Sequence, residues 1–228
     1  MFQSRKRGII ITQQEHARLA YQLAAAYGND DFDLPDLPFD SFLTGVLFHD
    51  RGFGLLDEHE IGGMDAKEHL KVLRKGALET YSDPVADLVA QFHIRRLLGN
   101  KNYPSRDKVG ADLDGVIDTV LDSNQLERTI FERADRITRL CDSMSFDFCK
   151  ELICQQETRV FSRGCQSETT AIRHRTASLN RMAVSPWPFK PKTINGHVLG
   201  YKARGYPARL EPVLIPYLVE PDPIGNAT

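Results

Sequence analysis

Apolar residues recur every three or four positions through the first part of the chain, which predicts amphipathic helices. The first helix follows Thr12-Gln13-Gln14-Glu15, which has the spacing of a capping box, and ends before Gly28. Counting back four residues from Ala20 on its inward stripe reaches His16, in the first turn. Further helices are expected over residues 40–50, 65–75, 84–98 and 122–157.

Three stretches of the first part lack this periodicity. Residues 1–11 are expected to form an arm, in which Gly8-Ile9-Ile10-Ile11 suits a short strand. The glycine-rich residues 52–63 predict a loop, and the polar residues 100–121 predict an irregular connection between helices.

Helical periodicity fades after residue 158, where prolines become frequent. Short apolar runs such as Val198-Leu199-Gly200-Tyr201 and Val213-Leu214-Ile215 suit strands or extended chain. The sequence therefore predicts a mainly α fold. We expect a bundle of five or more helices over residues 1–158, with a C-terminal extended, β-rich extension over 159–228 packed on it.

Composition narrows the classes of partner. The 29 basic and 31 acidic residues give a formal net charge of −2, which offers no electrostatic reason to expect nucleic acid or an anionic membrane. No run of about 18 apolar residues is present, so the sequence predicts no membrane span. The four cysteines form no C-x-x-C pair and indicate reduced thiols. We expect a cytoplasmic protein.

Several histidines and aspartates fall on or beside the inward faces of the predicted helices. They are His16, the pair His49-Asp50, His93 and Asp142. Adjacent residues of a helix point about 100° apart, so the His49-Asp50 pair can offer an imidazole and a carboxylate to one ion, or bridge to a second. Two imidazoles and two carboxylates suit a divalent transition metal such as Fe, Mn, Co, Ni or Zn, whereas calcium prefers oxygen ligands throughout.

The order of these residues resembles the HD (His-Asp) superfamily of metal-dependent phosphohydrolases, and more closely an uncharacterised bacterial branch of it. The matching motifs are Gln13-Gln14-Glu15-His16-Ala17, His49-Asp50-Arg51-Gly52-Phe53 and Asp142-Ser143-Met144-Ser145-Phe146-Asp147-Phe148-Cys149, with Pro186-Trp187-Pro188-Phe189 similar to a proline–aromatic block that follows. Phe53 departs from the pattern, because tryptophan is usual there. The likeness extends over residues 12–189 but is thin between the motifs.

The resemblance implies an HD-type helical bundle with one or two metal ions. His16, His49, Asp50 and Asp142 correspond to the ligands of the first ion, and Asp50 is the residue to which catalysis is assigned. In two-ion members, two further histidines hold a second ion that the same aspartate bridges. His69 and His93 have the spacing for this role, and His59 competes with His69.

Several of these positions keep an ordinary alternative. Asp135 lies seven residues before Asp142, hence on nearly the same helix face and about 10.5 Å away, so one ion cannot bind both. The Asp-x-x-Ser match favours Asp142 as the ligand, in which case Asp135 pairs with a neighbouring arginine, and replacement of Asp142 by Asp135 stays open as the alternative. Arg96 either binds an anionic substrate or is a solvated arginine at a helix end. Asp57 either supports a ligand or is a loop acid, and Arg51 likewise either supports a ligand or is an ordinary loop residue.

The function that this pattern favours is hydrolysis of a small phosphorylated compound, with a metal-activated water as nucleophile. Two alternatives stay open: an HD-type di-iron oxygenase that oxidises a small molecule, and a non-catalytic metal-binding domain. The partner in the first reading is a small, anionic substrate. Residues 159–228 either close over the pocket or mediate assembly of a homo-oligomer, and the sequence favours neither.

Overall fold

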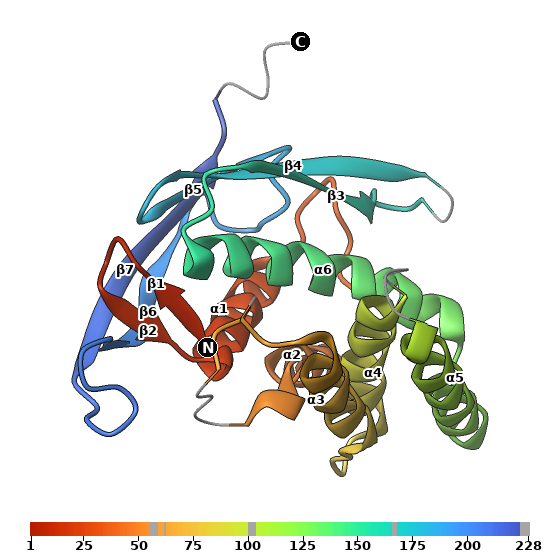
Figure 1. The fold of residues 1–228 in the computed structure, drawn as a ribbon. Coiled ribbons are helices and arrows are strands. Elements are labelled where there is room, and N and C mark those ends of the chain that lie inside the picture. Colours follow the sequence, from red (N-terminus) through yellow and green to blue (C-terminus); the bar gives the residue numbers. More distant parts are fainter. Residues whose placement is uncertain (55–58, 62, 100–103, 166–167, 224–228) are drawn as a thin grey trace.

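The first helix begins where its capping residue predicts. In the computed structural model, which describes residues 1–54, 59–61, 63–99, 104–165 and 168–223, α1 spans Gln13–Ala26 (Figure 1). The Thr12 side chain accepts a hydrogen bond from the Glu15 amide at 3.2 Å, which confirms one half of the predicted box. The Glu15 carboxylate does not complete the box. It accepts instead from the Leu199 amide at 2.8 Å and so ties α1 to a distant strand.

Five further α-helices and one short 3-10 helix follow among the described residues. They are α2 (Phe39–Leu47), η1 (Arg51–Phe53), α3 (Ala66–Leu78), α4 (Pro84–Leu98), α5 (Pro104–Asn124) and α6 (Arg128–Lys150). Within the described part of the chain, none of these helices combines the length and the hydropathy needed to cross a bilayer.

Between residues 100 and 157, the helices differ from the prediction in two ways. The connection expected over 100–121 contains α5, whose buried Leu113, Ile117 and Leu121 are spaced four residues apart and pack inward. The helix expected over 122–157 is shorter at both ends. α6 stops at Lys150 because Glu151 adopts a left-handed conformation, with φ of 56°, as the helix C-cap.

Seven strands form one sheet in the order β1-β2-β6-β7-β5-β4-β3. All neighbouring strands are antiparallel except β5 and β7, which run parallel. The strands are β1 (Phe2–Ser4), β2 (Ile9–Ile11), β3 (Gln155–Phe161), β4 (Thr169–Ser178), β5 (Arg181–Ser185), β6 (Ile194–Lys202) and β7 (Pro212–Pro221).

This sheet overturns the predicted fold class. A mainly α bundle with an extended appendage was expected, whereas the protein is a mixed α/β fold, so the description as all-alpha was wrong. The expected N-terminal arm supplies β1 and β2, which pair with each other, and β2 also pairs with β6 almost 200 residues later. The boundary expected at residue 158 lies inside β3, where alternate residues Thr158 and Val160 are buried.

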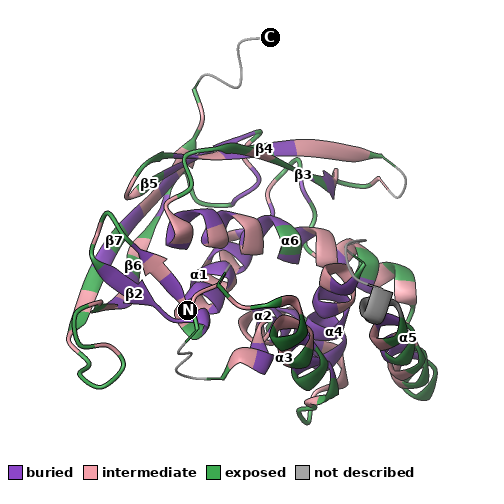
Figure 2. Ribbon diagram, in the orientation of Figure 1, coloured by how far each residue is buried: buried purple, intermediate pink, exposed green. Residues whose placement is uncertain are grey.

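The sheet curls around α1 and α6, and α2 to α5 lie beyond these two helices, away from the sheet (Figure 1). The buried residues of α1, α4 and α6 face the interior that these layers enclose (Figure 2). α1 is thus held between the sheet and the other helices. Its first turn, which carries His16, reaches the junction of α1, α2, α4 and α6.

Candidate metal centre

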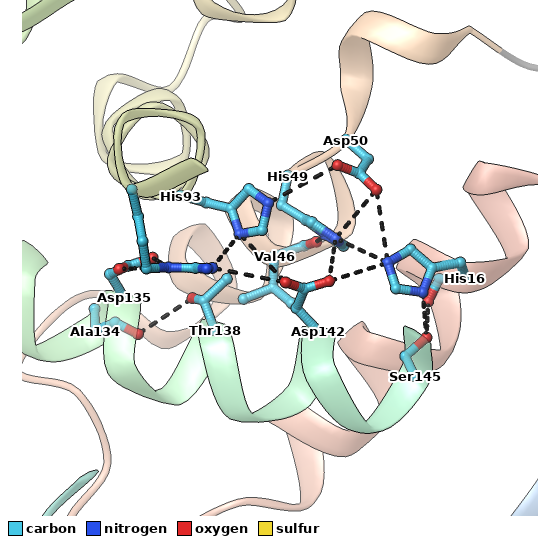
Figure 3. A network of polar contacts seen from close by, with 11 residues as sticks. His16, Val46, His49, Asp50, His93, Ala134, Asp135, Thr138, Asp142 and Ser145 are labelled. Atoms are coloured by element: carbon cyan, nitrogen blue, oxygen red, sulfur yellow. Dashed lines mark hydrogen bonds and ion pairs between the residues drawn. The ribbon is translucent and has the colours of Figure 1, made fainter. Parts of the chain in front are cut away.

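Four side chains from three separate parts of the chain meet between the helices. His16 comes from α1, His49 and Asp50 from the segment after α2, and Asp142 from α6 (Figure 3). The Nε2 atoms of His16 and His49 are 3.3 Å apart. Asp50 Oδ2 is 3.6 Å from each Nε2, and Asp142 Oδ1 is 3.2 Å from that of His16 and 3.5 Å from that of His49. The two carboxylates approach the imidazole pair from opposite sides (Figure 3).

The His49-Asp50 pair lies in a turn, and not inside a helix as predicted, because α2 ends at Leu47. A close crossing explains why the chain turns here. A Cβ on Gly52 would lie 2.2 Å from the Val72 carbonyl oxygen of α3, a distance that no side chain can adopt. Glycine at position 52 therefore lets the turn rest directly on α3, which fixes the direction of the two candidate ligands.

Arg51, between the pair and this glycine, anchors the turn to the core. Its side chain is 1% exposed, its Nη1 donates to Asp87 Oδ1 at 2.5 Å, and its Nε donates to the Gly76 carbonyl at 2.7 Å. The second oxygen of Asp87 accepts from the Tyr81 amide at 2.8 Å. From the sequence, Arg51 is either a support for a ligand or an ordinary loop residue. Its position directly after the His-Asp pair was the one available signal, and that signal does not reveal a buried ion pair.

The proton of each central histidine is located by the partner of its other ring nitrogen. His49 Nδ1 lies 2.7 Å from the Val46 carbonyl oxygen, which can only accept, so Nδ1 carries the proton. Ser145 Oγ donates its single proton to the His16 carbonyl at 2.6 Å and therefore accepts from His16 Nδ1 at 2.7 Å. In the neutral state, both rings consequently direct an Nε2 lone pair towards the centre.

The centre therefore gathers two lone pairs and two carboxylates in a nearly closed space. The His16 and His49 side chains are 1% and 0% exposed, while Asp50 and Asp142 are 12% and 18% exposed. Burial acts to lower the pKa of His49, but the charge of Asp50 and the contact with Asp142 outweigh it and raise that pKa to about 9. Such a set demands a compensating positive charge, which either an extra proton or a bound cation supplies.

His93 on α4 lies beside these four residues, but its ring carries the proton on Nε2, whereas those of His16 and His49 carry it on Nδ1. The Arg96 guanidinium, which can only donate, is 2.8 Å from His93 Nδ1, so Nε2 carries the hydrogen. That Nε2 lies 3.8 Å from Asp50 Oδ1, and Nδ1 lies 3.9 Å from Asp142 Oδ2. Burial, followed by the charge of Arg96, lowers the pKa of His93 well below its usual value, so the ring is neutral.

Asp142, and not Asp135, is the α6 aspartate that faces the two central histidines. Asp135 receives Arg96 Nε at 3.0 and 3.3 Å, as the alternative reading of the sequence allowed. Arg96 Nη2 lies 3.6 Å from Asp142 Oδ2, so this arginine links the two aspartates. Burial raises the pKa of Asp135, although the nearby Arg96 charge acts to lower it.

The remaining candidates lie elsewhere. His69 on α3 is half-buried, and its ring centroid is 6.4 Å from that of Phe53. It does not belong to the described residues whose ligand atoms gather within 4.8 Å of one another, which are His16, His49 and Asp50. His59 is exposed. Asp57 lies outside the described residues.

Comparison with known proteins places the chain in a family. A family profile described as "Protein of unknown function (DUF3891)" matches residues 1–202. The chain belongs to this family. The DUF3891 match includes all four residues of the centre and the strands β1 to β6. No curated protein and no solved structure matches the chain.

Proposed function

We propose that this DUF3891 protein binds one divalent transition metal ion through His16, His49, Asp50 and Asp142, and that it hydrolyses a small phosphorylated compound. The observation that carries the proposal is the tautomer of the two central histidines. Because both Nδ1 protons are engaged, each Nε2 lone pair faces an oxygen of Asp50 and one of Asp142 at 3.2–3.6 Å. A cation satisfies all four groups at once.

The residues present fit an ion of the class expected from the sequence. Imidazole nitrogen suits Zn, Fe, Co, Ni and Mn, and two carboxylates extend the set to metals that prefer oxygen. The Val46 carbonyl and the Ser145 hydroxyl orient the two rings, which is the support that metal-binding histidines ordinarily have. A divalent cation also neutralises the two carboxylate charges.

The position of His93 favours one ion over two. A second ion bound through His93 Nε2 needs a lone pair there, but the Arg96 contact at Nδ1 leaves the hydrogen on Nε2. The Arg96 guanidinium, 3.6 Å from Asp142, would also repel a second cation. The di-iron oxygenase needs two ions, so these contacts support the hydrolase.

A bound ion of this class lowers the pKa of coordinated water and polarises a phosphoryl oxygen. Hydrolysis forms a new phosphorus–oxygen bond to water and breaks the bond to the leaving oxygen, which takes a proton. Arg96, 24% exposed and held by Asp135, is the positive group nearest the cluster that can bind the phosphoryl oxygens. The neutral His93 presents an Nε2–H donor on the same side. His16 and His49 are almost fully buried, whereas Asp50, Asp142 and Arg96 are partly exposed and can be reached from solvent.

Two further observations support this reading. The motifs around the four residues resemble the HD phosphohydrolases, which supplies the phosphorylated substrate by analogy. All four cysteines are free, which is typical of the reducing environment of the cytoplasm, where we propose that the protein acts.

Metal analysis of protein purified without chelator tests the proposal. We expect close to one equivalent of metal in the wild type and in Asp135→Asn, and a loss of metal in Asp142→Asn, because Asp142, and not Asp135, faces the two histidines. Phosphate release from p-nitrophenyl phosphate is expected to follow metal content. His93→Gln is expected to retain its metal.

Three results would overturn parts of the proposal. Unchanged metal content in a folded Asp50→Ala variant contradicts the metal centre. Two irons per chain together with oxygen consumption contradict the hydrolase in favour of the oxygenase. Loss of metal in His93→Gln contradicts the assignment of His93 as a hydrogen-bond donor.

A further inference from the structure

A groove of about 780 Å³ lies between α4, α5 and α6, next to the metal centre. Its walls are unusually rich in guanidinium groups. Five arginines line it: Arg95, Arg96, Arg128, Arg136 and Arg139. Such a concentration of forked cations on one concave surface is typical of sites that bind phosphate or carboxylate groups.

The groove continues directly from the candidate ligands. Arg96 and Asp135, which line it, also contact the centre through His93 and Asp142. On α6, residues 128, 132, 135, 139 and 142 are spaced by four, three, four and three positions and therefore share one helix face. The metal-facing Asp142 ends this stripe, and Arg139 is the next residue along it, about 4.5 Å away along the helix axis.

The arginines differ in how far acidic neighbours already compensate them. Arg95 pairs with Asp114 at 2.8 Å, Arg96 with Asp135 at 3.0 Å, and Arg128 with Asp118 at 2.6 Å. An anionic ligand would have to displace these carboxylates to bind the three arginines.

Arg139 and Arg136 make no ion pair with a carboxylate of the described residues. Arg136 lies over the Phe161 ring, 5.0 Å from its centroid, and donates to the Arg159 carbonyl at 3.4 Å. Arg139 is exposed, and within the described part of the chain it has neither an ion pair nor a hydrogen bond. Its charge acts on Asp135, which already pairs with Arg96, and Arg139 itself makes no ion pair. It is thus the exposed cation next to Asp142 on the α6 face of the groove.

We propose that the groove recognises a second anionic group of the substrate, with Arg139 as the receptor. This inference rests on the proposed function and names its substrate class: a diphosphate or a compound with two closely spaced phosphates, and not a simple monoester. The reacting phosphoryl group lies at the metal centre beside Arg96, and the second anion lies one helical turn further along α6, beside Arg139. Arg139 is a specificity residue in this arrangement, because it touches the part of the substrate that does not react.

Calorimetric titration tests this with two compounds that cannot be hydrolysed, methylphosphonate and methylenediphosphonate, on the protein as purified. We expect the diphosphonate to bind about tenfold more tightly than the monophosphonate, as for one added charge-assisted contact. Arg139→Gln is expected to abolish this preference, and Arg139→Lys to retain part of it. Because Arg139 is exposed and unpaired, neither change is expected to lower the melting temperature.

Arg128→Gln is the matched control. It removes the same charge from the same groove and the same helix face, but Arg128 is paired with Asp118 and lies about 21 Å along the axis from Asp142. The preference for the diphosphonate is expected to survive this change. Equal binding of the two compounds by the wild type, or a preference that survives in Arg139→Gln, overturns the inference.

The outcome is separable from that of the proposed hydrolysis. Phosphate release and metal content test the reaction, whereas the titration measures binding alone. A preference that depends on Arg139 in a protein without hydrolytic activity would uphold the anion site and reject the hydrolase. Hydrolytic activity without that preference would uphold the hydrolase and reject the anion site.

Discussion

The Nε2 atoms of His16 and His49 face each other across 3.3 Å, although the residues are 33 positions apart in the chain. Between two neutral rings, a direct hydrogen bond would require one of them to carry its only proton on Nε2. That arrangement would sacrifice the contact of His49 Nδ1 with the Val46 carbonyl or that of His16 Nδ1 with Ser145. The close approach is therefore stabilised either by an extra proton on His49, whose pKa is raised to about 9, or by the cation that we propose, with the Nδ1 protons held on the far side of each ring.

Ser145 is the residue through which this arrangement can be tested without touching a ligand. Ser145→Ala removes the acceptor for His16 Nδ1–H and frees the ring to adopt the other tautomer. We expect metal affinity to fall by about 10- to 100-fold, as is usual when the partner of a metal-binding histidine is lost. Competition with a chromophoric chelator measures this.

Ser143→Ala is the control for that change. Ser143 lies on the same helix, and its hydroxyl donates to Gln156 Oε1 at 3.2 Å, away from the centre. Its metal affinity is expected to equal that of the wild type. An unchanged affinity in Ser145→Ala would show that the tautomer of His16 does not matter for binding.

Arg51 and Asp87 form the buried ion pair that holds the His49-Asp50 turn. Arg51→Met leaves the Asp87 carboxylate, 7% exposed, without its counter-ion, and removal of one partner of a buried pair costs about 3–5 kcal/mol. We expect a loss of this size in the free energy of unfolding, measured in urea. Metal affinity should fall with it, because the turn that carries two candidate ligands is no longer anchored.

The control for Arg51 is an exposed pair. Arg181 is 54% exposed and contacts Glu220 at 2.6 Å, and exposed pairs contribute about 0–1 kcal/mol. Arg181→Met is therefore expected to leave both stability and metal affinity nearly unchanged. If Arg51→Met behaves like Arg181→Met, the turn does not depend on the buried pair.

Glu151, the C-cap of α6, clamps the turn between β1 and β2. Its carboxylate accepts from the Ser4 hydroxyl and from the amides of Lys6 and Arg7, the last two at 3.0 and 3.2 Å. Burial acts to raise the pKa of Glu151, but these hydrogen bonds and the charge of Arg7 outweigh it and lower the pKa. The carboxylate thus stabilises the fold above its unfolded pKa of about 4.3, and this contribution is lost as pH falls through the lower folded value.

Glu151→Gln is accordingly expected to lower stability at pH 7 and to weaken its decline below about pH 4. Urea unfolding at a series of pH values measures both effects. Glu157→Gln, at a strand residue that is 45% exposed, should preserve the acid dependence of the wild type. If the stability of Glu151→Gln declined below about pH 4 as steeply as that of the wild type, Glu151 could not be the source of this acid dependence.

The sequence predicts those features that depend on local periodicity and capping. His16 is found by counting back from Ala20, and the Thr12 cap follows from its spacing to Glu15. The sheet could not be found in this way, because β1 and β2 are three residues each, and β2 joins the sheet through a strand near the other end of the chain. Such pairing depends on contacts that no local window contains.

The candidate centre likewise has some features that the sequence predicts and others that depend on three-dimensional contacts. The order of the motifs predicts that His16, His49, Asp50 and Asp142 form one site, and in the structure these four side chains lie close together. Residue spacing does not show which ring nitrogen of each histidine carries the proton, because this depends on contacts with Val46, Ser145 and Arg96 in the folded protein. The distinction between His93 as ligand and His93 as donor therefore had to await the structure.

Two glycines provide a last prediction with opposite signs. A Cβ at Gly52 would lie 2.2 Å from the Val72 carbonyl oxygen and 3.0 Å from the Gly76 amide nitrogen, both backbone atoms that cannot move aside cheaply. Gly52→Ala must push the His49-Asp50 turn away from α3, and such overpacking costs about 1–3 kcal/mol.

Gly115, in the middle of α5, is exposed and has nothing within 4 Å of its Cβ position. Gly115→Ala is therefore expected to raise stability by up to about 1 kcal/mol, the difference in helix propensity between the two residues. Urea unfolding distinguishes the signs, and metal titration should show weaker binding for Gly52→Ala alone. If Gly52→Ala proved as stable as the wild type and bound metal equally well, direct contact of the turn with α3 could not be what positions the two ligands.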